Sequence, residues 1–505
     1  MVRHGTRART PEWLFALLAI LVLATHFSYL GLPYFWDELG QFVPAALDLY
    51  HDGSLVPHSA VPNAHPPGVM AYLALAWRVF GYSIPTTRSA MLLLASLAVF
   101  AAGLLALELC PESGRTPPII AVLLLLVDPL FYTQSMMAQL DMPAMLFTIL
   151  ALLLFLKDRH AAAAACCTAL LLIKETGAIL PLVLGLFLAF DSTRSRRALY
   201  YLAPFVILGL WFLLLWRSTG HVFGDTGFTQ YNISYALQPV RATLSLLRHA
   251  YYLLFADFRW IGSVAMWLAW RTRRLYSTRP WKITWVFVAA HVVLVSVLGG
   301  AELERYLLPV IPLIYIASAA ALMALPPLWR TVAIATAAAG LFAGLFINPP
   351  FPFPFENNLA MVDFVALHRT AAQFLEKNAA DKAIYTAWPL TAALRNPAFG
   401  YVGEGLGVVE TSDLRYSTLQ KIDPLAADVL VLYSRTWEPS WGVLRWRAVQ
   451  EFLKRFYAYE PEMDSAAVRA HFGLQEVARW SRRGQWIEVY ARPGLAASSE
   501  HSTQP

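Results

Sequence analysis

Residues 11–32, PEWLFALLAILVLATHFSYLGL, form a predominantly apolar run, and residues 33–42, PYFWDELGQF, follow it directly. The first stretch reaches the roughly 20 residues that a helix needs to cross a bilayer. A basic segment precedes it, as in a signal peptide, but no small-x-small cleavage site follows, so we expect an uncleaved first span. The second stretch places two adjacent carboxylates, Asp37 and Glu38, at the end of that span.

The composition of the whole chain is that of a membrane protein. Of its 505 residues, 58% are hydrophobic and only 14% are charged, whereas a soluble protein carries about 25% charged residues. The net charge of +6 does not indicate nucleic-acid binding, because the basic residues lie in short loops between apolar runs. The three cysteines lie in or beside those runs, so no disulfide framework is expected. We predict a polytopic α-helical membrane protein.

Apolar length predicts about eleven membrane spans, of which the fifth and sixth are short and meet at the sequence KETG. Asp257 and Arg259 interrupt the start of the eighth. The basic loops fall on one side of the membrane if the N-terminus is cytoplasmic. The first loop, residues 33–84, the loop at 218–249 and everything after about residue 350 then lie outside the cytoplasm. We expect an integral protein of the plasma or inner membrane. The predicted spans cover residues 12–32, 85–107, 117–133, 140–156, 161–174, 176–190, 198–217, 250–270, 283–300, 306–325 and 329–347.

Three segments outside these spans have helical patterns. Residues 38–53 and 66–81 of the first loop are too short to cross a bilayer and are expected to be interfacial helices. Residues 237–254 carry apolar side chains at helical spacing, with Arg241 and Arg248 off the apolar stripe. This pattern also predicts an interfacial helix.

Composition changes at a Pro-rich break over residues 348–358. We expect a membrane domain over residues 1–350, a small extracytoplasmic α/β domain over residues 356–495 that sits over the site, and a disordered tail over residues 496–505. The α/β pattern consists of strands at 382–388 and 427–434, helices at 361–378 and 444–459, and a hairpin around Arg483 and Gly484.

Acidic and basic residues gather at the extracytoplasmic end of the predicted bundle, whereas the other end carries mostly Arg and Lys. Ionisable groups near a bilayer are costly and are often functional. A sugar linked to a lipid phosphate would need such a mixture, because its phosphate needs Arg or Lys and the acceptor hydroxyl needs a carboxylate base. The gathered residues are Asp37, Glu38, His65, Asp141, Lys174, Glu175, His221, Asp225, Glu302, Glu304 and Arg305.

Short stretches of the chain resemble, in order, the GT-C superfamily of polyprenyl-phosphate-sugar-dependent glycosyltransferases. The likeness is to the branch that holds protein O-mannosyltransferases and the lipid A aminoarabinose transferase, and it covers roughly residues 12–325. The stretches are WDELGQFVPAALDLYHDG (36–53), HPPGVMAYLALAWRVFGYSIPTTRSAMLLLASL (65–97), DPLFYTQSMMAQLDMPAMLF (128–147), KETG (174–177) and ERYLLPVIP (304–312).

The resemblance implies roles for individual residues. The catalytic candidates are Asp37 as general base, Glu38 beside it, and Asp141 in the same cavity. The candidates for binding the lipid phosphate are His65, Arg88, Lys174, Arg305 and Tyr306. The aminoarabinose transferase branch has an acid–lysine pair in the first loop, where this chain has Ala64 and His65. No metal ligands are assigned and no cofactor is expected to be required, but this departure leaves the acceptor and a divalent metal open.

Structural roles remain as alternatives for these residues. Asp37 and Glu38 can also be ordinary polar residues at the end of a helix where it meets water. Lys174 can pair with the adjacent Glu175, and Arg305 can extend towards the headgroups. Asp141 can cap the helix that begins after it, His65 can cap a helix ahead of two prolines, and Arg88 can be structural.

The sequence therefore predicts an inverting glycosyltransferase, hexosyl or pentosyl, at the extracytoplasmic face. Its donor would be a polyprenyl-phosphate sugar and its acceptor a lipid, glycan or protein; no nucleic-acid partner is expected. The alternative is a transporter or flippase, which would show internal repeats and ionisable groups near the midplane, neither of which is evident here. A third possibility is a membrane anchor whose soluble domain binds a partner.

Overall fold

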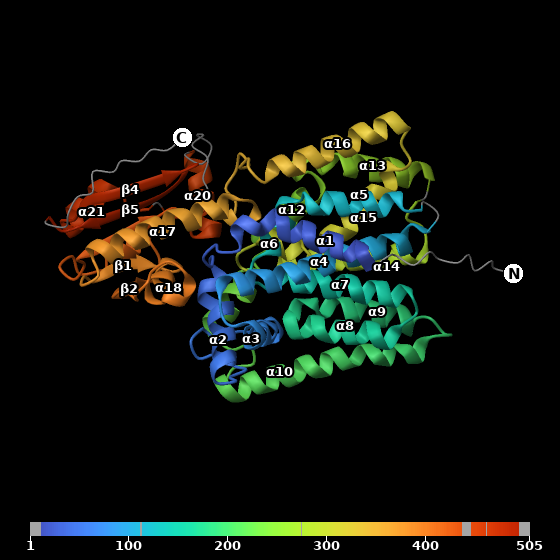
Figure 1. Ribbon diagram of the computed structural model, residues 1–505, viewed down its shortest axis with the longest axis horizontal. Coiled ribbons are helices and arrows are strands. Elements are labelled where there is room, and N and C mark those ends of the chain that lie inside the picture. Colours follow the sequence, from blue (N-terminus) through green and yellow to red (C-terminus); the bar gives the residue numbers. More distant parts are fainter. Residues whose placement is uncertain (1–11, 112–113, 274, 437–445, 461, 494–505) are drawn as a thin grey trace.

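The computed structural model describes residues 12–111, 114–273, 275–436, 446–460 and 462–493. Its helices run along the long axis of the molecule, and a β-sheet lies beyond one end of them (Figure 1). The predicted fold class is confirmed in this form: a largely helical membrane protein with a small C-terminal part that contains a sheet. The tail at 496–505, expected to be disordered, lies outside the described residues.

The helices before residue 350 share one hydrophobic core, and many also carry exposed apolar side chains such as Leu210, Trp216 and Trp270 on their outer faces. Helices that are apolar on the outside as well as the inside suit a lipid environment. The principal helices are α1 (Glu12–His26), α4 (Ile84–Leu109), α5 (Thr116–Leu126), α6 (Pro129–Ser135), α7 (Asp141–Leu156), α8 (His160–Ile173), α9 (Ile179–Ala189), α10 (Ala203–Thr219), α13 (Trp260–Arg273), α14 (Arg279–Val297), α15 (Ile311–Leu322) and α16 (Pro327–Gly344).

Three helical stretches in the described part of the chain are long and apolar enough to cross a membrane, namely Ile84–Leu109, Ser195–Thr219 and Arg279–Val297. A fourth results if α5 and α6, which are bent by 69° relative to each other, form one broken span. Several other helices, such as α7, α8 and α15, are apolar but shorter. The predicted number of about eleven spans is therefore not confirmed.

One buried ion pair lies at breaks within two of the predicted spans, 117–133 and 250–270. Asp128 caps α6 by accepting a hydrogen bond from the Phe131 amide, and it also accepts one from Arg259 at 2.5 Å. Arg259 follows Asp257 and Phe258, whose φ angles of 49° and 65° separate α12 from α13. Neither 117–133 nor 250–270 is thus a single straight helix, because a buried charged residue interrupts the apolar run in each.

The first loop folds into helices at the end of the bundle nearer the sheet (Figure 1). A π-helical turn, η2 (Glu38–Phe42), leads into α2 (Val43–His51), which packs on α3 (Gly68–Phe80). The α3 helix contacts both α4 and α8. The helices predicted at 38–53 and 66–81 are confirmed.

The predicted helix over 237–254 is also confirmed, as α12 (Pro239–Leu254), and its polar side faces inward. Arg241, Ser245 and His249 are buried, whereas Leu247 and Tyr251 are exposed. The apolar stripe thus faces outward and the basic side chains face the protein interior.

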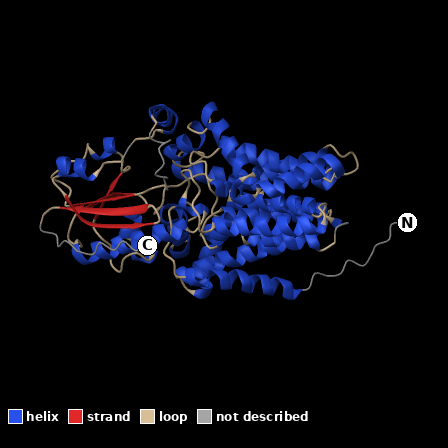
Figure 2. Ribbon diagram, turned by 90° about the horizontal axis from the view of Figure 1, so that it is seen from above, coloured by secondary structure: helices blue, strands red, loops and turns tan. Residues whose placement is uncertain are grey.

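The C-terminal part contains a five-stranded sheet with strand order β2-β1-β3-β5-β4 (Figure 2). The strands are β1 (Ile384–Ala387), β2 (Val408–Thr411), β3 (Val429–Tyr433), β4 (Gln475–Arg482) and β5 (Gln485–Ala491); the principal helices around them are α17 (Ala360–Asn378), α18 (Leu390–Arg395), α20 (Arg447–Tyr457) and α21 (Ser465–Phe472). β1 pairs in parallel with β2 and β3, and β5 pairs antiparallel with β3 and β4. The predicted strands and hairpin are confirmed, and β2 was missed because it is a short strand that is mostly exposed.

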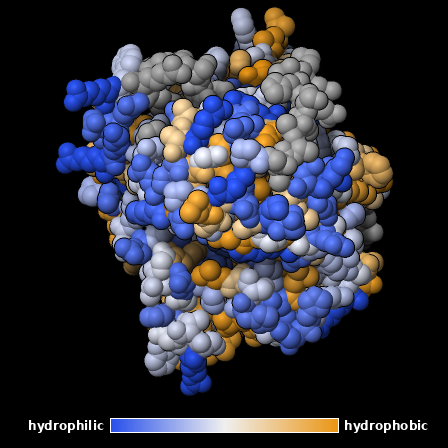
Figure 3. Space-filling view, turned by 90° about the vertical axis from the view of Figure 1, so that its left-hand side faces the viewer, coloured by the Kyte–Doolittle hydropathy of each residue, from blue (hydrophilic) through white to orange (hydrophobic). Residues whose placement is uncertain are grey.

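The outer end of this part presents a mostly hydrophilic surface (Figure 3). Its inner side packs against the first loop, where Trp36 meets Phe364 of α17 and Trp388, which follows β1. A Cβ added at Gly40 in η2 would lie 2.3 Å from Nε1 of Trp388. Only glycine therefore permits this approach between the loop and the sheet.

Gly40→Ala is expected to lower stability by about 1–3 kcal/mol, because the added methyl group overpacks against the Trp388 indole. The measurement is the melting temperature of the purified protein in detergent. Gly31→Ala is the matched control, since a Cβ at Gly31 has nothing within 4 Å. Equal melting temperatures for the two variants would contradict the packing described here.

Candidate active site

A cavity of about 1020 Å³ lies where the end of the bundle meets the C-terminal part. Asp37 of the first loop, Asp141 at the start of α7 and Lys174 at the end of α8 contribute to its lining. Arg305 from η8 (Glu304–Leu307) and Arg435 after β3 also line it. Its volume is in the range of small-molecule sites, and its lining carries charges of both signs.

The Arg305 guanidinium lies at the centre of the charged cluster. It donates hydrogen bonds to Asp37, to Glu356 at 3.1 Å and to Gln139 at 2.6 Å. Its Nε also lies 3.3 Å from Oδ2 of Asp141. Burying a charge is costly unless the charge is well paired. Here the single guanidinium of Arg305 is shared by three carboxylates.

Asp37 is the most accessible carboxylate of this cluster, with 16% of its side chain exposed, compared with 3% for Asp141 and for Glu356. It lies between Trp36, whose φ of 47° turns the chain, and the first residue of η2. The Trp36 ring packs against Trp388 and Phe364. The local fold thus directs Asp37 into the cavity beside aromatic walls.

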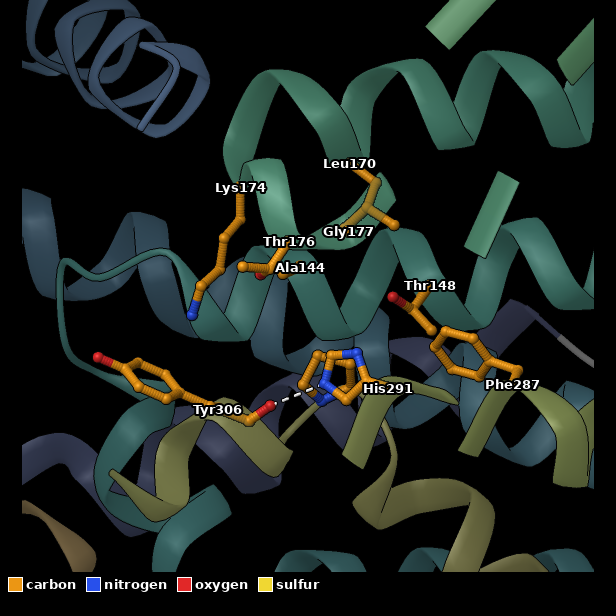
Figure 4. Close-up of a pocket in the computed structure, with 10 residues that line it drawn as sticks. Ala144, Thr148, Leu170, Lys174, Thr176, Gly177, Phe287, His291 and Tyr306 are labelled. Carbon is orange, nitrogen blue, oxygen red and sulfur yellow. Dashed lines mark hydrogen bonds between the residues drawn. The ribbon is translucent and has the colours of Figure 1, made fainter. Parts of the chain in front are cut away.

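Lys174 is the second cation at this end. Its Nζ lies 2.5 Å from Oδ1 of Asp141 and 4.1 Å from the centroid of the Tyr306 ring. Figure 4 shows the Lys174 side chain directed towards the Tyr306 ring, with the Tyr306 carbonyl accepting a hydrogen bond from His291 at 2.8 Å. Lys174 thus pairs with Asp141 and not with the adjacent Glu175, which has another partner.

That partner is His65, whose Nδ1 lies 2.8 Å from Oε2 of Glu175. Burial would raise the pKa of Glu175, but His65 and Lys174 outweigh it and hold the pKa below its ordinary value. His65 lines the cavity together with Asn63, which accepts a hydrogen bond from the His65 amide. His65 is thus at the site, held by an acid from the α8–α9 connection.

Glu38 has a different environment from its neighbour Asp37. Its side chain is fully buried, pairs with Arg88 at 2.5 Å and accepts hydrogen bonds from the amides of Phe35 and Ala138. Arg88 also donates to the carbonyls of Leu32, Pro33 and Met136. All of its N–H directions are used, so this geometry leaves Arg88 no donor for a phosphate.

Glu356, in η9 (Phe355–Asn357), was not identified from the sequence. It lies in the segment that connects the bundle to α17, and its side chain contacts Arg305 inside the cavity. Burial raises its pKa to about 7, although Arg305 opposes this and Asp37 adds to it. A single glutamate after a Pro-rich stretch resembles an ordinary linker residue, so its sequence context gave no signal.

A second group of charges lines the other side of the cavity. Arg241 of α12 lies 3.1 Å from Glu302 and stacks over the ring of Tyr235 at 3.5 Å. Arg248 pairs with Glu304 at 2.5 Å. The C-terminal part adds Arg435, which lies over the Trp36 ring. No group of three or more His, Cys, Asp or Glu side chains within the described ranges is arranged to hold a metal ion.

Comparison by sequence finds no protein-family model and no curated protein that matches the chain. Comparison by structure finds ArnT from Cupriavidus metallidurans bound to undecaprenyl phosphate, with a TM-score of 0.57 and 16% identity over 97% of this chain and 100% of that chain. The apo state of the same protein matches with a TM-score of 0.53 and 16% identity, over 94% and 97% of the two chains.

A third solved structure is the archaeal oligosaccharyltransferase AglB from Archaeoglobus fulgidus, in complex with an inhibitory peptide and a dolichol phosphate. It matches with a TM-score of 0.51 and 12% identity, over 97% of this chain and 75% of that chain. ArnT and AglB are GT-C superfamily glycosyltransferases. The fold of this chain is therefore similar to the GT-C fold, as the resemblance in its sequence motifs predicts.

Arg88→Ala is expected to lower the free energy of unfolding by about 3–5 kcal/mol, because it leaves Glu38 charged and buried without a partner. Arg395→Ala serves as the control, since Arg395 pairs with Glu410 where both side chains are exposed, and such a pair contributes at most about 1 kcal/mol. Denaturant unfolding of the two purified variants measures the difference. A similar loss in both would show that the Arg88–Glu38 pair does not hold the first loop.

Proposed function

We propose that the protein is an inverting glycosyltransferase that moves a hexosyl or pentosyl unit from a polyprenyl-phosphate donor to a hydroxyl of a lipid, glycan or protein. The observation that carries this proposal is the meeting of Asp37 with Lys174 and Arg305 in one large cavity. The undecaprenyl phosphate and dolichol phosphate in the solved ArnT and AglB structures support the choice of donor.

The two cations would bind the donor phosphate. Arg305 offers planar, paired donors, and Lys174 adds a point charge held at the same end by Asp141. Their charge stabilises the polyprenyl phosphate as it leaves the sugar. Asp141 contacts both cations and therefore sets the distance between them, while the Tyr306 ring packs against Lys174.

Asp37 would act as the general base. It accepts the proton of the acceptor hydroxyl as the hydroxyl oxygen bonds to the anomeric carbon, and the bond from that carbon to the phosphate oxygen breaks. Because the attacking oxygen and the phosphate lie on opposite sides of the sugar, the configuration inverts. Arg305 contacts Asp37 in the present structure, so a bound phosphate would share this guanidinium with the base.

The organisation of the chain follows from this function. We propose a membrane domain over residues 1–350 and an extracytoplasmic domain over residues 356–495, with a cytoplasmic N-terminus. The shorter apolar helices would also cross the bilayer, which gives about eleven spans. The site then lies outside the cytoplasm at headgroup depth, where a lipid-linked donor and a membrane acceptor can meet.

Asp37→Asn is expected to reduce glycosyl transfer by about 10²–10⁴-fold, because the amide cannot accept the hydroxyl proton. The assay follows transfer from a polyprenyl-phosphate sugar by the purified protein. Asp52→Asn is the matched control, since Asp52 is an exposed acid of the same loop that pairs with His58. Full transfer by the Asp37 variant would exclude this residue as the base.

Lys174→Met is expected to raise the KM for the donor at least about tenfold, because a charge-assisted contact to phosphate is lost. Lys157→Met is the matched control and should leave the KM unchanged. Lys157 follows α7 directly, at the opposite end of that helix from Asp141. Initial rates at varied donor concentration separate KM from kcat. An unchanged KM in the Lys174 variant would assign this lysine to structure alone.

A further inference from the structure

The Pro-rich connection between the bundle and α17 ends in two polar side chains that both contact η8. Glu356 accepts a hydrogen bond from Arg305, and Asn357 donates one to Glu304 at 2.9 Å. The backbone carbonyl of Glu356 also accepts a hydrogen bond from Thr133 of α6 at 2.6 Å. The connection is therefore fixed to the very turn that carries the proposed phosphate ligand.

The charges at this end of the cavity do not balance. Three carboxylates, Asp37, Asp141 and Glu356, face two cations, Lys174 and Arg305. An entering phosphate adds further negative charge to a cluster that is already one charge negative when all five groups are ionised. Neutralising one of these carboxylates would remove repulsion against the entering anion and so strengthen its binding.

The surroundings of each carboxylate identify which one becomes neutral. Asp141 lies 2.5 Å from Lys174, so protonating it would leave that lysine without its partner. Asp37 is the most exposed and must stay ionised to accept a proton. Glu356 is 3% exposed and contacts Arg305 at 3.1 Å, and burial raises its pKa to about 7. Protonation is therefore cheapest at Glu356.

We propose that Glu356 is a positioning residue that takes up a proton from solvent when the phosphate of the donor binds, and that this frees the Arg305 guanidinium to contact the phosphate. This inference rests on the proposed function. The proton adds to a carboxylate oxygen of Glu356, no covalent bond of the donor changes in this step, and the proton returns to solvent when the polyprenyl phosphate leaves. Glu356 lines the cavity, which gives the proton a route from water.

Every titratable group that faces Glu356 bears on this equilibrium. Arg305 and Tyr306 face it from η8, Asp37 from the segment before η2, and Asp141 from the start of α7. Arg305 favours the ionised form, whereas Asp37 and Asp141 favour the protonated form. A phosphate bound to Arg305 weakens the attraction that favours ionised Glu356 and adds to the repulsion that favours protonated Glu356. Phosphate binding and protonation of Glu356 therefore favour each other.

The consequence is a donor affinity that falls as the pH rises through about 7. Since the bound state holds more protons than the free state, affinity is greatest when Glu356 is already protonated, below its pKa. Above this pKa the affinity falls by up to about tenfold per pH unit, until the pKa of the bound state is reached. At about pH 8 binding should take up close to one proton, and at about pH 6 almost none.

The probe is farnesyl methyl phosphate, a phosphodiester that carries one negative charge and no group that titrates near neutral pH. Isothermal calorimetry of the full chain in detergent, in two buffers of different ionisation enthalpy, gives the number of protons taken up. Wild-type protein should show uptake at about pH 8. Binding with no proton uptake would overturn this inference and leave the proposed function standing, whereas no binding at all would count against both.

Glu356→Gln should bind the probe with no proton uptake and with an affinity that does not change with pH. At about pH 8 this affinity should exceed that of the wild type, because no carboxylate competes for Arg305, whereas a merely structural role predicts weaker binding at every pH. Glu356→Asp should retain the uptake. Glu302→Gln is the matched control, since Glu302 lines the same cavity but pairs with Arg241; loss of uptake in this control instead would refute the assignment.

Discussion

Arg305 is the charge on which the candidate-site end of the molecule depends. It is buried, and it contacts Asp37 from the first loop, Asp141 from the start of α7 and Glu356 from the connection to α17. A buried charge costs several kcal/mol unless it is well paired, so these three segments are held where their carboxylates can reach one guanidinium. In the proposed function the same residue binds the donor phosphate, so it would serve both folding and catalysis.

Two other buried arginines fix the surroundings of this centre. Arg88 holds the first loop through Glu38, and Arg259 holds the bend before α6 through Asp128. Adjacent carboxylates in the first loop thus have different surroundings. The Glu38 carboxylate forms an ion pair and accepts hydrogen bonds from backbone amides. These contacts anchor the turn from which Asp37 faces the cavity.

The sequence predicted features that depend on local pattern. The apolar runs indicated the helices, the β4–β5 hairpin followed from alternation around Arg483 and Gly484, and the GT-C motifs placed Asp37, Lys174 and Arg305 in one site. It did not predict the break near Asp128, because hydropathy counts apolar length and does not reveal which charges will meet. Near Asp257 it indicated that Asp257 and Arg259 interrupt the span, but not that Arg259 pairs with Asp128.

The remaining misses have the same origin. Arg241 lies on the polar side of an amphipathic helix, which on the surface would face water, but this side faces the cavity. Arg88 of α4 matches a family motif and pairs with Glu38 of the first loop, and its role at a phosphate stays a prediction. Glu356 becomes important only through a contact with a residue about fifty positions earlier, and no local pattern encodes such a contact.

The clamp of Glu356 and Asn357 on Glu304 and Arg305 has a consequence for how the protein is made. The chain emerges from the ribosome from its N-terminus, so every helix through α16 precedes the residues that complete the Arg305 cluster. The bundle can insert in the bilayer before this stage, but Arg305 then lacks Glu356, one of its three carboxylate partners. In the proposed function, the donor site would therefore be completed last, after the C-terminal part of the chain has been synthesised.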